Sequence, residues 1–340
     1  MADIRDLALH LNISTGTVSR ALNNRPGVNA ATRARVLEAA IELGYVANQS
    51  GRSLRRGATN TIGFLIETGS AANQESGDFF FILLDALHLY LAGKGFDLMI
   101  LPCHSADDPA EFLGRLVARG LVDAVVITAT RRHDRRIEML TRSTLPFLTL
   151  GRSETPGAYP WIDMDFDGVA RRSVAELVAQ GHRRIALALP DNDVMLGYHY
   201  RRGYEAAMAD AGLTLDPALI FRNPTSEAGG FALGRQLAQA RPSAVMLCSE
   251  ATTVGLYAGL QREGITPGPD LSIVTFRENP QLRFLSPAPA TFRVDISAIG
   301  RLIGENVIAL LSPDTRPEAA RAEILVPLDY LPGASICPPR

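Results

Sequence analysis

The chain has 340 residues, a length that predicts two or three domains rather than a single core. With 46% hydrophobic and 21% charged residues, its composition excludes a chain that is disordered as a whole. The cysteines include no CxxC pair, so we predict neither a disulfide framework nor a zinc site. The polar start MADIRDLALHLNIS lacks the apolar stretch of a signal peptide, and no later apolar run reaches the roughly 18 residues of a membrane span. We therefore expect a cytoplasmic protein without a membrane partner.

Charge is unevenly distributed along the chain. Residues 1–60 contain eight arginines and four carboxylates, a net charge of +4, whereas the whole chain carries −2. The remaining residues therefore carry a net charge of −6. A small basic segment joined to a larger acidic one is typical of a nucleic-acid-binding domain attached to a domain of another kind.

Residues 1–46 have the pattern of three short helices. Apolar residues recur at helical spacing, at positions 4, 7, 8 and 11, then 18, 21 and 22, and then 36, 37, 40 and 41. Between the first two patterns, Asn12 suits a left-handed turn and Ser14 suits the N-cap of the next helix. The connecting loop is then about three residues long, which is the spacing of a helix-turn-helix unit.

The second of these helices carries most of the predicted DNA contacts. In a helix-turn-helix unit it enters the major groove with its N-terminal residues toward the base edges. We expect Thr15, Gly16 and Thr17 to lead this helix, and Arg20 to make a bidentate contact with a guanine. The predicted phosphate contacts are Ser14, Thr17, Ser19, Asn23, Asn24 and Arg25. The spacing alone also allows a structural three-helix cap that does not bind DNA.

The run STGTVSRALNNRPGVNAATRARVLEAAIELGYVAN favours DNA binding. It closely resembles the headpiece of the lactose-repressor (LacI/GalR) family of bacterial regulators, in which a TVSR-A-L-N run is followed by V and TR landmarks, and then by LGY and an asparagine. The resemblance implies a sequence-specific, ligand-responsive transcriptional repressor that acts as a homodimer on a roughly palindromic operator. Gly16 departs from the family, which usually has a base-contacting side chain at that position.

From residue 60 onward, short apolar runs alternate with helical stretches. Runs such as TIGFLI, VDAVVIT, RRIALAL and LSIVTF are typical of parallel strands covered on both faces. The alternation predicts doubly wound parallel α/β sheets in two lobes, with the chain passing between them in the polar stretch 152–168. The family resemblance continues here, and it implies that residues 60–340 are a periplasmic-binding-protein-like domain for effector binding and dimerisation.

Ligands of open α/β sheets bind beyond the carboxyl ends of the strands, so residues that follow the apolar runs are candidates for a ligand site. Phe79 and Phe80 match the paired aromatics that the resembled family uses against a sugar face. The resemblance implies a sugar bound between the lobes, Arg277 adds the possibility of an acidic sugar derivative, and we predict no cofactor. The predicted effector contacts are Glu67, Phe79, Phe80, Thr128, Asp165, Asp191, Arg201, Ser249 and Arg277.

Arg277 stands where the resembled family has a carboxylate that binds ligand hydroxyls. A guanidinium inverts the local charge, and it favours a carboxylate or phosphate on the ligand through a bidentate pair. Alternatively, Arg277 pairs with Glu278 or Glu250, and the pocket takes a neutral sugar or is vestigial. The sequence leaves both interpretations open.

Metal and enzyme motifs give no competing assignment. Asp163, Asp165 and Asp167 alternate as calcium ligands can, but the glycine and terminal glutamate of an EF-hand do not follow at the required spacing. We find no dinucleotide fingerprint, Walker A loop, HExxH or GxSxG motif, so we predict no enzyme. The alternative function is a cytoplasmic sugar sensor that does not bind DNA.

Residues 47–59 lie between the two predicted domains. The resembled family has a short hinge helix here, whose pattern is matched by Asn48, Arg52 and Leu54. A helix this short is marginal alone, so we expect it to fold on DNA. Leu54 is then the side chain that enters the minor groove and kinks the duplex, with Arg52 and Arg55 on phosphates. The alternative is a flexible linker.

Overall fold

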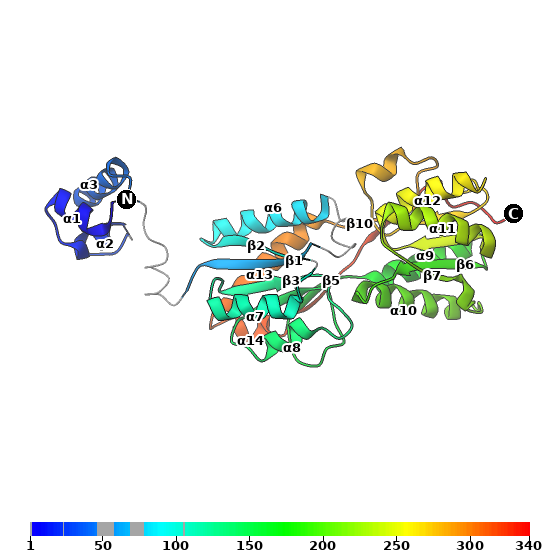
Figure 1. The fold of residues 1–340 in the computed structure, drawn as a ribbon, viewed down its shortest axis with the longest axis horizontal. Helices are drawn as coiled ribbons and strands as arrows, with labels where there is room; N and C mark the ends of the chain where they lie inside the picture. The colour runs from blue at the N-terminus through cyan, green and yellow to red at the C-terminus, as the bar shows by residue number, and fades with distance from the viewer. Residues whose placement is uncertain (1, 23, 46–57, 69–77, 105) are drawn as a thin grey trace. The chain divides into compact units, whose positions relative to one another are not determined.

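A computed structural model describes residues 2–22, 24–45, 58–68, 78–104 and 106–340. The chain divides into two compact units, residues 1–59 and 60–340 (Figure 1). Each unit has its own hydrophobic core. None of the helices within the described residues is long and apolar enough to span a membrane.

The first unit is a three-helix domain formed by α1 (Ile4–Leu11), α2 (Thr15–Leu22) and α3 (Ala30–Glu42). Asp3 begins α1 with a capping box, because its carboxylate accepts from the Arg5 and Asp6 N–H groups while its own N–H donates to Asp6. The three predicted helices are therefore confirmed. Their core consists of Leu7, Ala8, Val18, Ala21, Val36 and Ala39. In α3 the predicted apolar face is only partly right, because Ala39 is buried in place of Leu37 and Ile41, which are exposed.

The second unit consists of two α/β lobes, of which the first holds a six-stranded parallel sheet in the order β11-β5-β4-β3-β1-β2. Helices α6 and α13 pack on one face, and α7 and α8 pack on the other (Figure 1). The strands are β1 (Thr61–Glu67), β2 (Asp97–Cys103), β3 (Ala124–Ile127), β4 (Phe147–Leu150), β5 (Trp161–Met164) and β11 (Glu323–Val326). The helices are α6 (Asp78–Gly93), α7 (Pro109–Arg119), α8 (Arg135–Thr141), α13 (Ile296–Leu311) and α14 (Arg316–Ala319).

The second lobe holds a four-stranded parallel sheet in the order β7-β6-β8-β9. Helices α9 and α10 pack on one face, and α11 and α12 pack on the other. The strands are β6 (Ile185–Pro190), β7 (Ile220–Asn223), β8 (Ala244–Leu247) and β9 (Ser272–Val274). The helices are α9 (Phe166–Ala179), α10 (Met195–Asp210), α11 (Glu227–Ala240) and α12 (Glu250–Arg262), with short 3₁₀ turns η1 (Pro217–Leu219) and η2 (Pro280–Phe284).

The apolar strands explain this layered arrangement. Every residue of β3 and of β6 is buried, as expected of parallel strands covered on both faces. Along β3, Ala124 and Val126 belong to the core under α6 and α13, whereas Val125 and Ile127 belong to the core under α7 and α8. The predicted two-lobed, doubly wound fold is confirmed.

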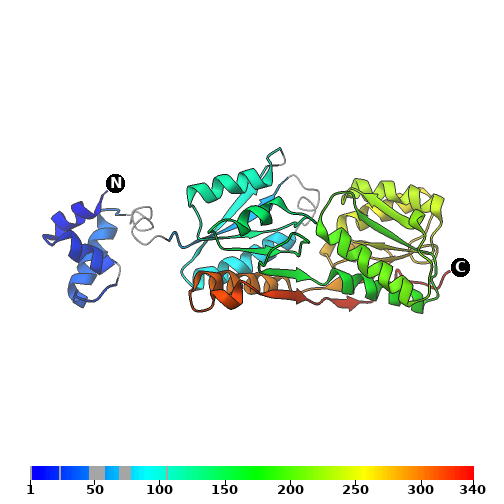
Figure 2. The same ribbon diagram turned by 90° about the horizontal axis from the view of Figure 1, so that it is seen from below.

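The chain crosses between the lobes three times within residues 106–340. The first crossing follows β5, the second follows β10 (Thr291–Arg293), and the third leads from β11 to β12 (Asp329–Leu331) (Figure 2). The first lies in the predicted stretch 152–168, but that stretch also contains β5, which we did not predict. The later crossings were missed because the antiparallel pair β10 and β12 is too short to give an alternating pattern.

Candidate functional site

The loop before α2 fixes this helix within the three-helix unit. Asn12 ends α1 in the predicted left-handed conformation, with φ 52° and ψ 47°. Ser14 Oγ accepts a hydrogen bond from the Thr17 N–H at 3.1 Å, so Ser14 caps α2. The loop therefore comprises residues 12–14, which is helix-turn-helix spacing.

Helix α2 buries one face and exposes the other. Val18 and Ala21 pack into the core. No carboxylate pairs with Arg20 among the described residues, so its guanidinium is available to an external partner. A Cβ at Gly16 would lie 3.7 Å from Ser14 Oγ, an ordinary contact, so the backbone does not require glycine there. The exposed or half-buried predicted contacts are Ser14, Thr15, Gly16, Thr17, Ser19, Arg20, Asn24 and Arg25. Asn23, Arg52, Leu54 and Arg55 lie outside the described residues.

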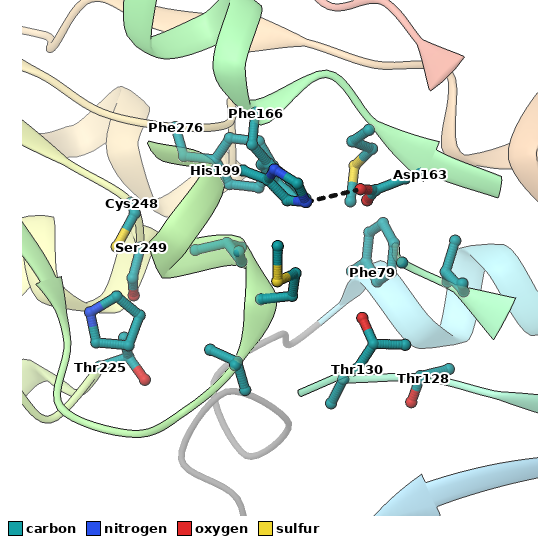
Figure 3. Close-up of a pocket in the computed structure, with 18 of the residues that line it drawn as sticks. Phe79, Thr128, Thr130, Asp163, Phe166, His199, Thr225, Cys248, Ser249 and Phe276 are labelled. Carbon is teal, nitrogen blue, oxygen red and sulfur yellow. Dashed lines mark ion pairs between the residues drawn. The ribbon is translucent and has the colours of Figure 1, made fainter. Parts of the chain in front are cut away.

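A cavity of about 170 Å³ lies between the two lobes, at the carboxyl ends of both sheets (Figure 3). The first lobe contributes the ends of β3, β4 and β5 and the start of α6. The second contributes the starts of α9, α10 and α12 and the segment after β9. A buried water needs only about 10–15 Å³, so the cavity has room for a small molecule. Its position is the one predicted for a ligand of open α/β sheets.

Part of the predicted effector set lines this cavity, namely Phe79, Phe80, Thr128, Ser249 and Arg277. The rings of Phe79 and Phe80 lie 5.3 Å apart between centroids at an interplanar angle of 82°. Thr128 Oγ1 donates to the Leu65 carbonyl at 3.3 Å, and Ser249 Oγ caps α12 by accepting from the Thr252 N–H. The two aromatic residues therefore offer an apolar wall, while these two hydroxyls are already engaged within the protein.

Glu67 does not line the cavity, so the structure gives no support to its predicted ligand contact. Its Oε1 accepts from Arg136 Nη1 at 2.6 Å, and its Oε2 accepts from Arg131 Nη2 at 2.6 Å. Arg136 is 1% exposed and also pairs with Asp134 at 2.6 Å. We call Glu67, Arg131, Asp134 and Arg136 the Arg136 network. Both carboxylate oxygens of Glu67 accept hydrogen bonds within this network.

Asp165, Asp191 and Arg201 also lie outside the cavity lining, so the structure gives no support to their predicted ligand contacts either. Asp165 caps α9 by accepting from the Gly168 N–H at 2.9 Å. Arg201 is exposed and pairs with Glu205 one helical turn away, at 2.6 Å. Asp191 is exposed to solvent after β6. Local capping, a surface ion pair and exposure thus account for the three residues.

Arg277 is buried in the cavity wall beside Glu250. The distance from Arg277 Nε to Glu250 Oε1 is 2.7 Å. The guanidinium carbon lies 5.1 Å from the centre of the Phe79 ring. Glu278, the other partner considered, pairs with Arg293 instead. The structure thus has the ion pair, and Arg277 adds no net charge to the cavity.

Besides Arg277 and Glu250, a second cluster of charged residues reaches the cavity wall, and it was not predicted from the sequence. Arg152 Nε donates to Asp163 Oδ2 at 2.8 Å, and Arg152 Nη2 lies 3.3 Å from Asp167 Oδ2. His199 Nδ1 lies 3.2 Å from Asp167 Oδ2 and 3.1 Å from Arg202 Nη2. We call Arg152, Asp163, Asp167, His199 and Arg202 the His199 network. A carboxylate inside the apolar run WIDM was the available signal, whereas the histidine has no comparable sequence context.

Two carboxylates of the His199 network respond oppositely to their surroundings. Asp163 is 3% exposed, and burial raises its pKa although Arg152 opposes the shift. Burial also acts to raise the pKa of Asp167, but its contacts with His199 and Arg202 hold that pKa well below its usual range. Asp167 is therefore the firmly ionised member, and the charge of Asp163 is costly unless further donors reach it.

Three buried polar atoms of the cavity wall lack a hydrogen-bond partner among the described residues. They are His199 Nε2, Thr225 Oγ1 and Glu250 Oε1. Glu250 Oε1 is close to Arg277, but the two groups are not aligned as a hydrogen bond. Buried polar groups in folded proteins nearly always have a partner, so these atoms are candidate contacts for a polar group bound in the cavity.

The two lobes contact each other directly beside the cavity. The Met195 N–H donates to the Thr130 carbonyl at 2.7 Å, and Arg131 and Val194 form an isolated antiparallel bridge. These contacts join the segment after β3 to the start of α10, the helix that carries His199. A group bound between the lobes therefore lies next to the contacts that hold them together.

Comparison with known proteins identifies the family. Residues 3–48 match the model described as "Bacterial regulatory proteins, lacI family", and residues 174–336 match the "Periplasmic binding protein-like domain". The chain is 34% identical to the HTH-type transcriptional regulator AglR of Rhizobium meliloti (strain 1021) over 95% of its own length and 93% of the relative. The chain belongs to the lacI family of bacterial regulatory proteins. This lacI-family member is a DNA-binding transcriptional regulator, and its matches place it among regulators rather than enzymes.

Further matches to the lacI-family chain agree in both sequence and fold. The HTH-type transcriptional repressor CytR of Escherichia coli (strain K12) is 28% identical over 88% of this chain and 87% of the relative. A lac repressor dimer bound to operator and the anti-inducer ONPF has a TM-score of 0.85 at 20% identity, covering 99% of each chain. A CelR–cellobiose complex has a TM-score of 0.74 at 23% identity, covering 98% of this chain and all of the other. These structures show that the fold is shared.

Proposed function

We propose that this lacI-family regulator is a cytoplasmic repressor whose affinity for operator DNA is controlled by a neutral sugar bound between its lobes. The observation that carries the proposal is the exposed polar face of α2 at helix-turn-helix spacing, with Arg20 unpaired by any carboxylate of the described residues. A bidentate contact of such an arginine to a guanine contributes about 1–3 kcal/mol of discrimination. Ser14, Thr15, Thr17 and Ser19 surround it with hydroxyls suited to phosphates and base edges.

The charge balance of the cavity supports a neutral ligand over an anion. Its described lining contains two arginines, Arg152 and Arg277, and two carboxylates, Asp163 and Glu250. Each arginine is paired with one of these carboxylates, so neither offers an unpaired positive charge. The unpartnered atoms comprise a ring nitrogen, a hydroxyl and a carboxylate oxygen, which together suit ligand hydroxyls. The cellobiose named for CelR is consistent with a sugar.

A homodimer is the proposed DNA-binding form. One recognition helix makes too few base contacts for useful specificity, whereas two copies related by a two-fold axis read both halves of a palindrome. Phe81 and Leu89 of α6 are 78% and 75% exposed, which is unusual for large apolar side chains unless a partner covers them. We propose that a second copy packs on this part of the first lobe.

The DNA-binding proposal can be tested without knowing the operator. Duplexes are selected from a random library with the full-length protein, and affinities are then measured by fluorescence anisotropy at fixed salt. Arg20→Ala is expected to weaken binding roughly five- to 150-fold, because it removes a guanine contact. Arg119→Ala, an exposed arginine at the end of α7, is the control that loses the same charge. Equal affinity of the two variants would contradict the assigned role of α2.

The effector proposal is tested by calorimetry with a panel of glucose, cellobiose, maltose, sucrose, glucuronate and glucose 6-phosphate. A neutral sugar is expected to bind and to change the affinity for the selected duplex. Binding of the anions alone would overturn the neutral-ligand proposal. A panel without any effect on DNA affinity would overturn effector control by these sugars.

We also propose that residues 47–59 act as the hinge, with Leu54 as the wedge in the minor groove. Leu54→Ala is expected to reduce operator affinity and bending while ligand affinity is retained. Gel mobility of duplexes with the selected site at different positions measures the bending. An unchanged affinity and bend would leave the linker alternative.

A further inference from the structure

His199 Nε2 and Asp163 Oδ2 face each other across the boundary between the lobes (Figure 3). His199 belongs to α10 of the second lobe, and Asp163 belongs to β5 of the first. The two atoms are 3.9 Å apart, too far for a direct hydrogen bond. Both side chains line the cavity and both are almost completely buried, with residue exposures of 3%.

The surroundings of the imidazole determine what Nε2 offers. Arg202 Nη2 lies within hydrogen-bond distance of Nδ1, and a guanidinium can only donate, so this contact places the ring proton on Nε2. In this tautomer Nε2 is a donor without an acceptor in the described part of the protein.

Asp163 offers the complementary acceptor. When ionised, its carboxylate only accepts hydrogen bonds and has about four acceptor positions. Arg152 supplies the close contact, 2.8 Å from Nε to Oδ2, and a long one of 3.4 Å from its backbone N–H. Because burial makes the charge of Asp163 costly, an additional donor would stabilise it.

We propose that one hydroxyl group of the ligand occupies the gap between these two atoms, donating to Asp163 Oδ2 and accepting from His199 Nε2. An oxygen about 2.8 Å from each atom fits over a separation of 3.9 Å. The inference rests on the proposed effector function and specifies it further. It assigns Asp163 and His199 as the subsite that recognises a hydroxyl as both donor and acceptor.

The bridging position gives this hydroxyl a regulatory role. Its two partners belong to different lobes, so its bond energy depends on the separation of the lobes. A ligand can shift the equilibrium between lobe arrangements only through interactions that differ between them, and this pair of hydrogen bonds is such an interaction. A ligand analogue that lacks the hydroxyl is expected to bind more weakly and to lose part of its effect on DNA affinity.

Two substitutions of His199 separate this role from a structural one. The amide nitrogen of His199→Gln extends about as far as Nε2, so it retains a donor toward the gap. The amide of His199→Asn extends about as far as Nδ1, so it retains a group near Arg202 and Asp167 but leaves the gap without a donor. Arg201→Gln is the matched control on the same helix, since Arg201 is exposed, pairs with Glu205 and does not line the cavity.

Calorimetry of the full-length variants measures the affinity for the neutral sugar that binds the parent, together with its monodeoxy analogues. We expect His199→Asn to lose about five- to tenfold in affinity, while His199→Gln stays within about threefold and Arg201→Gln is unchanged. One monodeoxy analogue should lose a similar factor with the parent but little further affinity with His199→Asn, because both changes remove the same bond.

The possible outcomes distinguish this subsite from the wider effector proposal. If Gln and Asn variants bind alike, or if the Gln variant is the weaker one, His199 acts through Asp167 and Arg202, and the subsite is refuted. If every monodeoxy analogue loses the same factor in affinity with His199→Asn as with the parent, the ligand hydroxyl binds elsewhere. This result also refutes the subsite. If no sugar of the panel binds the parent, the proposed effector function itself fails.

Discussion

The Arg136 network and the His199 network both pair arginines with carboxylates, but the His199 network adds an imidazole and the two differ in completeness. In the Arg136 network, both carboxylate oxygens of Glu67 and of Asp134 accept hydrogen bonds, and the donors among the described residues, Arg131 and Arg136, belong to the first lobe. In the His199 network the groups come from both lobes. Its ring atom Nε2 has no hydrogen-bond partner in the described part of the chain.

This difference indicates which buried charges serve the fold and which serve the ligand. A buried carboxylate whose acceptor positions are filled has nothing left to offer a ligand, so the Arg136 network holds the segment after β3 in place. A buried group that keeps an unused donor beside a cavity carries a cost that a ligand can remove. The two networks should therefore respond oppositely in stability and in ligand binding.

The largest expected effect is on the complete network. Arg136→Leu leaves Glu67 and Asp134 buried without their main partner, and we expect it to lower the free energy of unfolding by about 3–5 kcal/mol. Urea unfolding of the full-length protein measures this change. The control is Arg135→Leu, whose exposed guanidinium pairs with Asp108 at the surface and should contribute little. Similar losses for both variants would show that the buried network has no special role.

A smaller but more specific effect is expected when the cavity loses one of its own charges. Glu250→Gln leaves Arg277 without its carboxylate, so glucuronate should gain affinity relative to glucose by about ten- to 100-fold, as expected for a new charged hydrogen bond. Glu278→Gln is the matched control, because Glu278 pairs with Arg293 outside this cavity. Calorimetry with both sugars decides, and an unchanged ratio in Glu250→Gln would mean that Arg277 does not reach the ligand.

Acid unfolding distinguishes the two carboxylates of the His199 network. The folded-state pKa of Asp167 is lowered, so its contribution to stability is present above the usual aspartate pKa of about 3.9 and is lost as the pH falls below that value. The raised pKa of Asp163 acts in the opposite direction. Between neutral pH and a pH of about 3, the free energy of unfolding should fall less in Asp167→Asn than in the parent. In Asp163→Asn it should fall at least as much as in the parent. Urea unfolding midpoints measured across this pH range test the prediction. If the midpoints of both variants fall equally with pH, the prediction is contradicted.

The smallest effects concern two hydroxyls of the cavity wall. Ser249 Oγ caps α12, so Ser249→Ala should cost about 1 kcal/mol of stability and change ligand affinity little. Thr225 Oγ1 is buried without a partner among the described residues, so Thr225→Val should not lower stability but should weaken sugar binding about fivefold. Thermal unfolding and calorimetry on both variants test this crossed pattern. If Ser249→Ala weakened sugar binding and Thr225→Val lowered stability, the distinction between hydrogen-bonded and unpartnered polar groups would be contradicted.

Local signals made the DNA-binding unit predictable. Asn12, Ser14 and the helical spacing of apolar residues act within a few positions of the chain, so the sequence alone indicates helices, caps and an exposed Arg20. The two-lobed fold was also predictable, because buried parallel strands are continuous apolar runs. Strand β5 was missed because a carboxylate, Asp163, interrupts so short a run.

The polar set of the ligand cavity was only partly predictable. Glu67 and Asp163 both lie on strands at the same edge of the sheet, and the sequence favoured Glu67. Which of them meets the cavity depends on the path of the segment that carries Arg131 and Arg136, which is set by tertiary packing. His199 was missed for the same reason, because its partners come from another lobe and from a neighbouring helix.

The most direct test of this account measures how a sugar changes the affinity of the regulator for its selected duplex. In the parent and in His199→Gln, we expect the effective neutral sugar to shift the anisotropy titration at similar concentrations. In His199→Asn, about five to ten times more sugar should be needed for the same shift. Equal sugar requirements in the Gln and Asn variants would contradict the claim that an open donor between the lobes couples the ligand to DNA binding.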